Sequence, residues 1–189
     1  VSGGILRRET FKNGILHGKY IENIQLYVDK VIKYNEYNYK DGKIDGKWIG
    51  YDGDRVSSET PFKNGERNGL RTSWFRNGKK MTEMYYKDDK LDGNLREWYR
   101  NGKIHKEETY KGGKKIGKHI VWYENGKKGK ECCYKNGVKD GLRTYWFENG
   151  KKESVEYFKD GHSNGNYTVW YENGQVCNEG ITKDGVQIE

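Results

Sequence analysis

Aromatic and apolar residues recur along this chain at a fixed spacing of 24 residues rather than in continuous runs. The stretch Tyr110–Cys133 shows the unit. An aromatic residue, Lys and a Gly-containing turn open it, a single Gly follows, and Trp-Tyr, one variable residue and Asn-Gly end the pattern. The same unit fits, without a gap, residues 62–85, 86–109, 134–157 and 158–181. Self-similarity at such a period predicts a repeat architecture.

Each unit contains two turn signals. The first is Asn-Gly, which predicts a type I′ hairpin turn where it lies between segments rich in β-branched and aromatic residues, such as Thr144–Phe147. The second is Lys followed by Asn, Asp or Gly and then Gly, and Lys87-Asp88-Asp89 departs from it by placing Asp where Gly is expected. Two turns per unit leave two short strands, so we predict an all-β fold, an elongated single-layer antiparallel meander of β-hairpin repeats. The predicted strands are 69–76, 79–86, 94–100, 103–110, 118–124, 127–134, 142–148, 151–158, 166–172 and 175–181.

Counting outward from the Asn-Gly turns predicts the strand register. With Asn149-Gly150 at the centre of its turn, Trp146 faces Glu153 and Gly141 faces Phe158. The same count sets Gly69 opposite Tyr86, Gly93 opposite Tyr110 and Gly117 opposite Tyr134. A ring that lies across a cross-strand glycine shields the bare backbone and fixes the register. We therefore expect Val at Gly117 to overpack against the ring of Tyr134.

Strand alternation separates the aromatic residues into two ladders. One face carries the tryptophans, a candidate aromatic binding face: Trp74, Trp98, Trp122, Trp146 and Trp170. The other face carries Phe75, Tyr99, Tyr123, Phe147 and Tyr171 together with Tyr86, Tyr110, Tyr134 and Phe158. The tryptophans could serve as a stacking platform, but packing between neighbouring repeats explains them as well.

The whole chain, residues 1–189, is predicted to be one repeat array without an interdomain linker. It divides into a half repeat 1–10, irregular repeats 11–38 and 39–61, regular repeats 62–85, 86–109, 110–133, 134–157 and 158–181, and a C-terminal half repeat 182–189.

A four-residue insertion lengthens one hairpin of the irregular part and is the most apolar stretch of the chain. With Asp29-Lys30 as the turn, Val28 faces Val31 and Tyr27 faces Ile32. Exposed apolar side chains at a projecting tip would form a partner-binding site, and the alternative is a cap that buries them against the first repeats. The candidate partner-binding residues are Ile24, Leu26, Tyr27, Val28, Val31, Ile32 and Tyr34.

The composition fits this fold and argues against an ordinary globular domain. Only 32% of residues are hydrophobic and 34% are charged, and the chain has 26 glycines and no alanine. Because Ala is the best helix former and Gly among the worst, we expect no helix. Three cysteines, two of them adjacent, do not form a disulfide framework.

No signal peptide is visible, and no apolar run approaches the ~20 residues of a membrane-spanning helix. The first residue is Val1, partway through a unit, which indicates a trimmed or processed form. The cytoplasm is the favoured compartment, with export open if a signal was removed.

The net charge of +8 permits acidic partners such as nucleic acid, anionic lipid or an acidic protein surface. The lysines that open the second type of turn should line one long edge of the sheet. The candidate polyanion-binding residues there are Lys63, Lys87, Lys111, Lys135 and Lys159. The alternative is a solvated rim that keeps the sheet soluble and discourages edge pairing.

No arrangement of residues indicates catalysis or a cofactor. His119 should face Cys132 across a hairpin, but a four-ligand zinc site needs a second pair nearby, so we predict no metal site. Glutamates at the repeat period, such as Glu83, Glu107 and Glu131, are interpreted as cross-strand partners rather than acid–base pairs.

The unit resembles the MORN-type repeat, and it is most similar to the bacterial variant whose members are described as antitoxin-like proteins. The resemblance rests on Tyr110-Lys111-Gly112-Gly113, Gly117 and Trp122–Lys128, which recur over nearly the whole chain. It implies hairpin repeats without enzymatic activity and a role in protein–protein contact, in peripheral contact with acidic phospholipid, or in neutralising a toxin. It also makes the bacterial cytoplasm the favoured compartment. Our hypothesis is a non-enzymatic protein-binding scaffold, with an antitoxin or immunity role as its specific version and an acidic-phospholipid or other polyanion binder as the alternative. We do not expect nucleic acid or small-molecule substrates as partners.

Overall fold

The computed structural model describes residues 7–27 and 30–188. All elements in these residues are β-strands, and the described strands pair in antiparallel fashion, which confirms the predicted all-β fold of hairpins. The chain packs as two compact units, of which the first ends at Leu91 and the second begins at Asp92.

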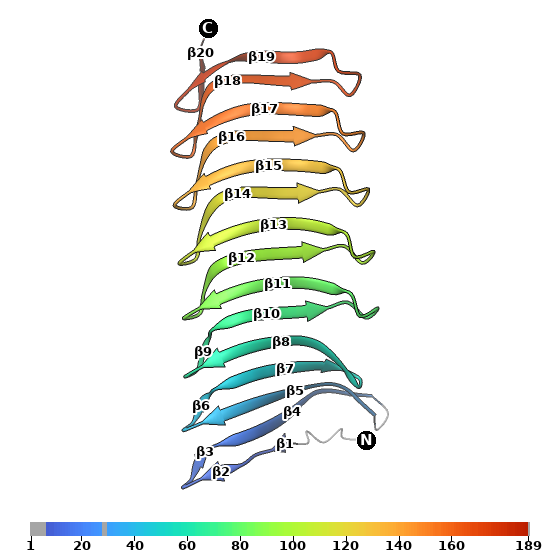
Figure 1. Ribbon diagram of the computed structural model, residues 1–189, viewed down its shortest axis with the longest axis vertical. Helices are drawn as coiled ribbons and strands as arrows, with labels where there is room; N and C mark the ends of the chain where they lie inside the picture. Colours follow the sequence, from blue (N-terminus) through green and yellow to red (C-terminus); the bar gives the residue numbers. More distant parts are fainter. Residues whose placement is uncertain (1–6, 28–29, 189) are drawn as a thin grey trace. The chain divides into compact units, whose positions relative to one another are not determined.

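The first unit contains short, irregular strands followed by longer hairpins (Figure 1). Its strands are β1 (Arg7–Arg8), β2 (Phe11–Lys12), β3 (Ile15–Leu16), β4 (Gly18–Tyr27), β5 (Lys30–Lys40), β6 (Lys43–Ile44), β7 (Gly46–Asp52), β8 (Arg55–Lys63), β9 (Glu66–Arg67), β10 (Gly69–Trp74) and β11 (Lys80–Lys87).

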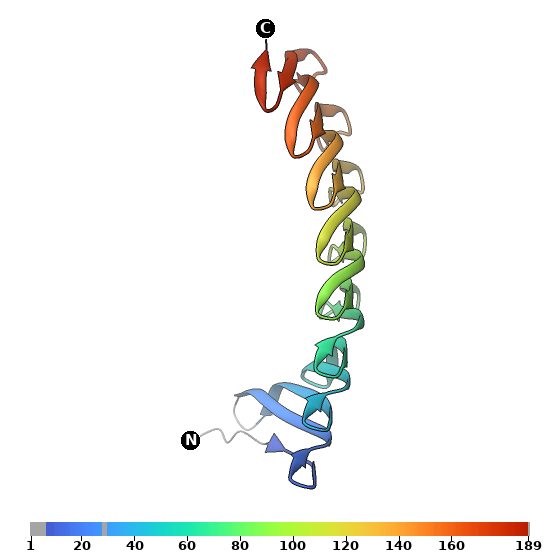
Figure 2. The same cartoon turned by 90° about the vertical axis from the view of Figure 1, so that its left-hand side faces the viewer.

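The second unit is a regular meander in which each strand from β12 to β20 pairs with the next. Seen from the side, its described residues form a single layer of strands (Figure 2). The strands are β12 (Lys90–Trp98), most of which belongs to this unit, β13 (Ile104–Lys111), β14 (Lys114–Trp122), β15 (Lys128–Lys135), β16 (Val138–Trp146), β17 (Lys152–Lys159), β18 (His162–Trp170), β19 (Val176–Lys183) and β20 (Val186–Ile188).

The Asn-Gly turns are hairpin turns but not of type I′, so that part of the prediction was wrong. In the turn between β16 and β17, only Gly150 has a positive φ, 91°. The amide of Gly150 donates to the carbonyl of Phe147 at 2.8 Å, and the amide of Phe147 donates to the carbonyl of Lys151 at 2.9 Å. This is a type I turn followed by a left-handed glycine. Asn149 stabilises it because its Oδ1 accepts from the amide of Lys151 at 2.8 Å.

The turns that open with Lys are the ones with type I′ geometry. Asn136 and Gly137 have φ values of 51° and 93°, and the flanking Lys135 and Val138 are paired. Asp88 and Asp89 adopt the same conformation with φ values of 49° and 62°. An aspartate therefore occupies the left-handed position that glycine occupies in the other units.

The predicted glycine–aromatic register is confirmed. Gly69, Gly93, Gly117 and Gly141 pair with Tyr86, Tyr110, Tyr134 and Phe158. Near the Asn-Gly turns the register shifts by one residue. Trp146 consequently pairs with Lys152 rather than with Glu153 as predicted. The strands before the Asn-Gly turns end earlier than predicted, as β16 does at Trp146 rather than at residue 148, because the turn is longer and a bulge follows it. From β12 to β18 these strands also begin earlier, because the single Gly lies inside the strand. The strands after the Asn-Gly turns begin one residue later than predicted.

The bulge brings the aromatic residue of the turn close to the extra residue of the next strand in the turns before β13 and β15, where Tyr99 lies beside His105 and Tyr123 beside Gly129. The rings of Tyr99 and His105 have centroids 4.5 Å apart. The hydroxyl of Tyr99 donates to the carbonyl of Trp122 at 2.7 Å, and that of Tyr123 donates to the carbonyl of Trp146 at 2.6 Å. Each of these tyrosines thus ties one repeat to the backbone of the next.

The expected overpacking at Gly117 was wrong. Gly117 has φ 66°, and no atom outside its chain neighbours lies within 4 Å of the position that a Cβ would occupy. The ring of Tyr134 is therefore not the obstacle there. Glycine is required by the left-handed backbone, because pairing between β13 and β14 shifts beside it.

Candidate functional site

The most buried side chains of the second unit lie mainly on the face that carries Tyr110, Tyr134 and Phe158, which we call the tyrosine face. Leu95, Cys132 and Phe158 are 5%, 0% and 6% exposed. Along the middle of this face run cross-strand pairs that we call the central row. In the second unit they are Leu95–Glu108, His119–Cys132, Arg143–Glu156 and Tyr167–Gly180.

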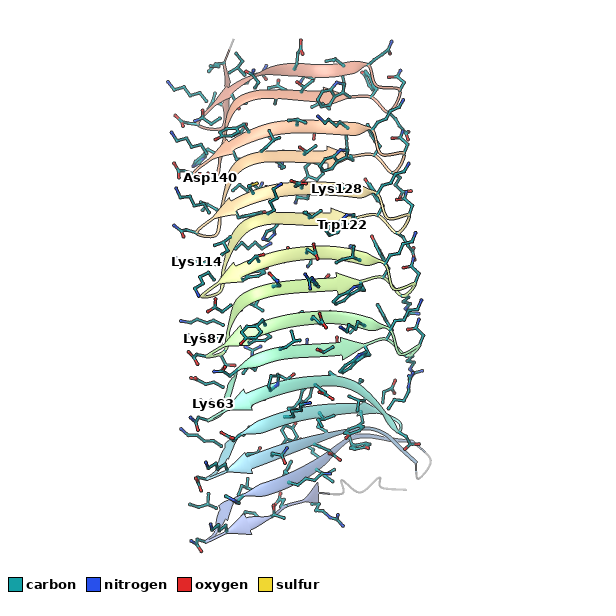
Figure 3. All side chains as sticks on the ribbon, viewed as in Figure 1. Lys63, Lys87, Lys114, Trp122, Lys128 and Asp140 are labelled. Carbon is teal, nitrogen blue, oxygen red and sulfur yellow. The ribbon has the colours of Figure 1, made fainter. Side chains whose placement is uncertain are left out.

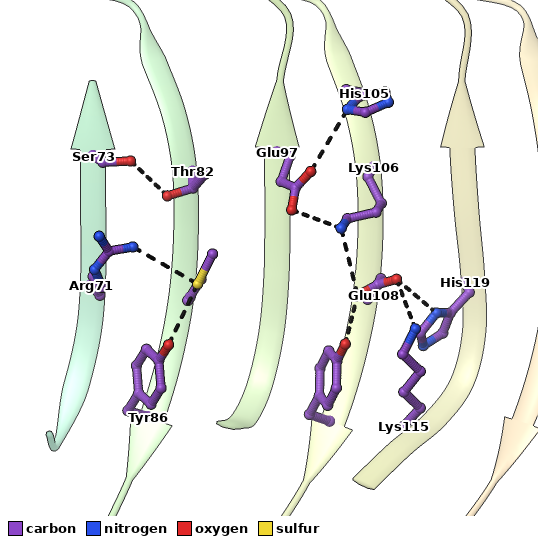
Figure 4. Close-up of polar contacts among 12 residues, drawn as sticks. Arg71, Ser73, Thr82, Tyr86, Glu97, His105, Lys106, Glu108, Lys115 and His119 are labelled. Atoms are coloured by element: carbon purple, nitrogen blue, oxygen red, sulfur yellow. Dashed lines mark hydrogen bonds and ion pairs between the residues drawn. The ribbon is translucent and has the colours of Figure 1, made fainter. Parts of the chain in front are cut away.

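Glu108 is the centre of a polar cluster formed by side chains of β13 and β14 (Figure 4). Its cross-strand partner on β12 is Leu95, so the carboxylate turns to β14 instead. Glu108 accepts hydrogen bonds from Tyr110 at 2.7 Å and Lys115 at 3.2 Å, and His119 Nδ1 lies 3.1 Å away. Two strands of one hairpin thus supply all three donors.

The electrostatics of this cluster favour a carboxylate that is ionised at neutral pH. Burial by itself raises the pKa of Glu108, but the hydrogen bonds from His119 and Tyr110 and the charges of Lys106 and Lys115 outweigh it and lower the pKa to about 2. Burial and the hydrogen bond to Glu108 raise the pKa of the Tyr110 hydroxyl. An ionised, buried and fully engaged Glu108 is suited to holding the hairpin together rather than to exchanging protons with a substrate.

In the first unit, a different residue fills the position of the 24-residue repeat that Glu108 fills here. Met84 occupies the place of Glu108, and its sulfur lies 3.6 Å from the Tyr86 hydroxyl and 4.0 Å from an Arg71 guanidinium nitrogen (Figure 4). Ser73 and Thr82 share a hydrogen bond of 2.7 Å beside them. The Glu108 cluster is therefore one packing variant of the row and not a feature set apart from it.

The predicted pairing of His119 with Cys132 is confirmed. His119 is 5% exposed and its ring lies 4.4 Å from that of Tyr134, while burial raises the pKa of the Cys132 thiol. Within the described residues no three His, Cys, Asp or Glu side chains gather in a way that could hold a metal ion. Nε2 of His119 has no hydrogen-bond partner among those residues.

The candidate polyanion-binding lysines all lie exposed beside type I′ turns. Lys63 and Lys87 project from that edge of the first unit, and Lys114 and Asp140 lie on the corresponding edge of the second (Figure 3). Lys111 is 3.3 Å from Asp92, which neutralises part of its charge. The prediction of an exposed lysine edge holds within each unit, whereas its role in binding stays a prediction.

The tryptophan face, named for the ladder of Trp74, Trp98, Trp122, Trp146 and Trp170, is neither fully buried nor fully open. All five tryptophans are half-buried. Lys128 Nζ lies 5.8 Å from the centre of the Trp146 ring and 2.6 Å from Glu131. Arg96 likewise pairs with Glu107 at 2.9 Å, so these glutamates do act as partners of neighbouring cations.

Sequence reasoning missed two exposed apolar pairs on the tryptophan face. Leu142 and Tyr157 are paired across β16 and β17 and are 49% and 44% exposed. Leu70 and Tyr85 form the equivalent pair of β10 and β11, 47% and 45% exposed. Strand alternation already places these residues on the same face as the tryptophans. Alternation does not tell which side chains of that face stay exposed, and only the structure shows this.

The lengthened hairpin is formed by β4 and β5, but its register differs from the predicted one. Tyr27 pairs with Lys30, and Leu26 pairs with Val31, with irregular pairing near Gln25. Val28 lies outside the described residues. So do the side chains of Ile24, Leu26, Tyr27, Val31 and Ile32, and their role in partner binding stays a prediction. Tyr34 stacks on Tyr51 with ring centroids 4.2 Å apart.

A family model described as MORN repeat variant matches five successive segments that begin 24 residues apart. The matched residues are 67–88, 91–111, 115–136, 139–160 and 163–184. No curated protein matches the chain. The described residues include no helix with the length and apolar character needed to cross a membrane.

Proposed function

The chain belongs to the MORN repeat variant family, and from this premise we propose that it is a non-enzymatic scaffold that binds a protein partner. Repeats of this family are associated with binding to proteins or membranes, and the family is not an enzyme family. The observation that carries the proposal is the Leu142–Tyr157 pair, two large apolar side chains left about half exposed beside the tryptophan ladder. Grouped exposed apolar side chains are typical of interaction surfaces.

The test replaces both residues with serine. The Leu142→Ser/Tyr157→Ser variant should lose its partner in quantitative pull-downs from the source cell, while its melting temperature changes little because both side chains are already exposed. Val138→Ser is the matched control, since Val138 is 45% exposed in the same unit but lies beside a turn. Equal recovery of the same partners by the double variant and the wild type would refute this surface.

In its most specific form the partner is a toxin that the chain neutralises. The net charge of +8 supports an acidic partner over a basic nuclease, because like charges suppress association. Co-expression with the recovered partner tests this version: rescue of growth by the wild type and not by the double serine variant supports it.

Binding of acidic phospholipid is the second candidate function. It is supported by the exposure of Lys63, Lys87, Lys111, Lys135 and Lys159 at the type I′ turns. Co-sedimentation with anionic vesicles over a salt series tests it, since screening weakens binding of this kind.

A further inference from the structure

The positive charge of the chain is concentrated in one short segment. Residues 111–139 contain nine lysines and two glutamates, against a net charge of +8 for all 189 residues. On the two faces these lysines are already engaged: Lys115 pairs with Glu108, and Lys118 and Lys128 pair with Glu131. At the opposite ends of the strands, Lys127 donates to the carbonyl of Asn149 at 2.6 Å.

Further exposed lysines lie at the type I′ edge of the second unit, and of these Lys111 is paired with Asp92. Lys111, Lys135 and Lys159 occupy the same position, the residue before each turn, and we call them the lysine row. All three are exposed. Among the described residues no carboxylate lies within ion-pair distance of Lys135 or Lys114, and a Cβ added to Gly137 would be only 3.7 Å from the Cβ of Lys114. Successive turns therefore present their cations close together.

The spacing of the lysine row selects a conformation for an acidic ligand. Neighbouring members are two strands apart, which corresponds to about 9.6 Å. A polyproline II helix has three residues per turn and rises about 9.3 Å per turn, so every third side chain faces the same way at nearly this distance. An extended β-strand fails because its third residue points to the opposite face. An α-helix presents the same face again after seven residues, at about 10.5 Å. Its side chains therefore fall out of step with the lysine row sooner than those of a polyproline II helix.

We propose that the lysine row binds an acidic polypeptide segment in the polyproline II conformation, with Asp or Glu at every third position. This inference rests on the proposed protein-binding function and assigns the chemistry of one partner segment. Each repeat contacts one carboxylate, and adjacent repeats extend the contact without a change in the ligand's conformation.

Acidic residues on the same edge tune the interaction. Asp92 lies 3.3 Å from Lys111, and Asp160 follows Lys159 in the chain. Asp160 has φ 49° in a type I′ turn, a position that Asn136 fills in the preceding repeat. Asp160→Asn therefore preserves the turn while removing a negative charge beside the row.

The test measures fluorescence anisotropy of a labelled peptide of repeating Glu-Pro-Pro. A peptide of the same composition, with all of its glutamates at one end, is the ligand control. The repeating peptide should bind more tightly, and Lys135→Gln/Lys159→Gln should weaken its binding about threefold to tenfold, as expected for the loss of two exposed charge pairs. Asp160→Asn should tighten the binding. Lys152→Gln, which removes an exposed lysine from β17 near the Asn-Gly turns, should leave it unchanged.

Three results would overturn the inference. They are equal binding of the two peptides, equal effects of the Lys152→Gln and Lys135→Gln/Lys159→Gln variants, and binding of phosphatidylserine vesicles or a single-stranded oligonucleotide without binding of the repeating peptide. None of these depends on Leu142 or Tyr157. If the peptide result is negative while the pull-down variants behave as expected, the protein-binding function stands and only the acidic segment is wrong.

Discussion

Gly117 and Gly141 occupy the same position in successive repeats, but a different physical reason requires glycine at each. Substitutions at both positions test this difference. Gly117 has φ 66° and open space where a Cβ would lie. Gly141 has φ 109°, and a Cβ there would be 3.2 Å from the Cβ of Cys133. Replacement of each by Ala and by Asn separates backbone strain from steric contact.

The expected magnitudes follow from these two environments. At Gly117 the left-handed backbone alone opposes Ala, which should cost about 1–2 kcal/mol, and Asn should cost clearly less because its side chain tolerates this conformation. At Gly141 the backbone lies beyond the left-handed helical region, so strain of about 1–3 kcal/mol applies to Ala and Asn alike. The contact with Cys133 adds to it. Asn should therefore rescue position 117 but not position 141.

Urea unfolding, followed by tryptophan fluorescence and by far-ultraviolet circular dichroism, measures the free energy of unfolding of each variant. The transitions seen by the two methods should coincide, because a single free energy of unfolding applies only to a two-state transition. Equal destabilisation by Ala and Asn at Gly117 would refute the assignment to φ. A Gly117→Val variant that loses far more stability than Gly117→Ala, and regains it when Tyr134 is shortened to Leu, would restore the overpacking explanation.

Two further predictions concern single hydrogen-bonding groups. Phe147→Tyr should stabilise the second unit by about 0.5–1.5 kcal/mol, because Tyr99 and Tyr123 at equivalent positions donate to the carbonyls of Trp122 and Trp146; Tyr123→Phe should cost a similar amount, and thermal melts check both. Glu108 has a folded-state pKa of about 2, below its ordinary 4.5, so its ionisation stabilises the fold above about pH 4.5 and this stabilisation is lost as the pH falls towards 2. The melting temperature of the wild type should therefore fall more than that of Glu108→Gln between about pH 6 and pH 3; parallel curves would contradict the role of this carboxylate.

The sequence predicted the fold and the register because both depend on residues with few alternatives. Each aromatic residue, such as Tyr134, pairs with a glycine on the preceding strand, and the turn residues limit how far a strand can slip. The turn types were harder to predict. Asn-Gly suits a type I′ turn, but it also suits a type I turn followed by a left-handed glycine. The two are distinguished in the structure by the hydrogen bond from the amide of Gly150 to the carbonyl of Phe147.

The bulges escaped prediction for a similar reason. The residue left unpaired beside each Asn-Gly turn is Met81, His105, Gly129, Glu153 or Cys177. These side chains share no chemistry, so no pattern marks the position. What they share is their position in the repeat. His105 lies against Tyr99, and a Cβ at Gly129 would be 3.1 Å from the Tyr123 ring.

The central row shows why variable residues in a repeat need not be functional. Gly180 is small where its partner Tyr167 is large, because a Cβ at Gly180 would be 2.9 Å from that ring. Arg143 is matched by Glu156 in an ion pair. Glu108 finds its donors on its own strand and on the next, because Leu95 offers none. Each variation is answered by its neighbours, as expected when stability is a sum of nearest-neighbour terms. Leu142 and Tyr157 stay about half exposed, and Lys135 and Lys159 of the lysine row have no carboxylate within ion-pair distance among the described residues. These are therefore the places where we propose that a partner binds.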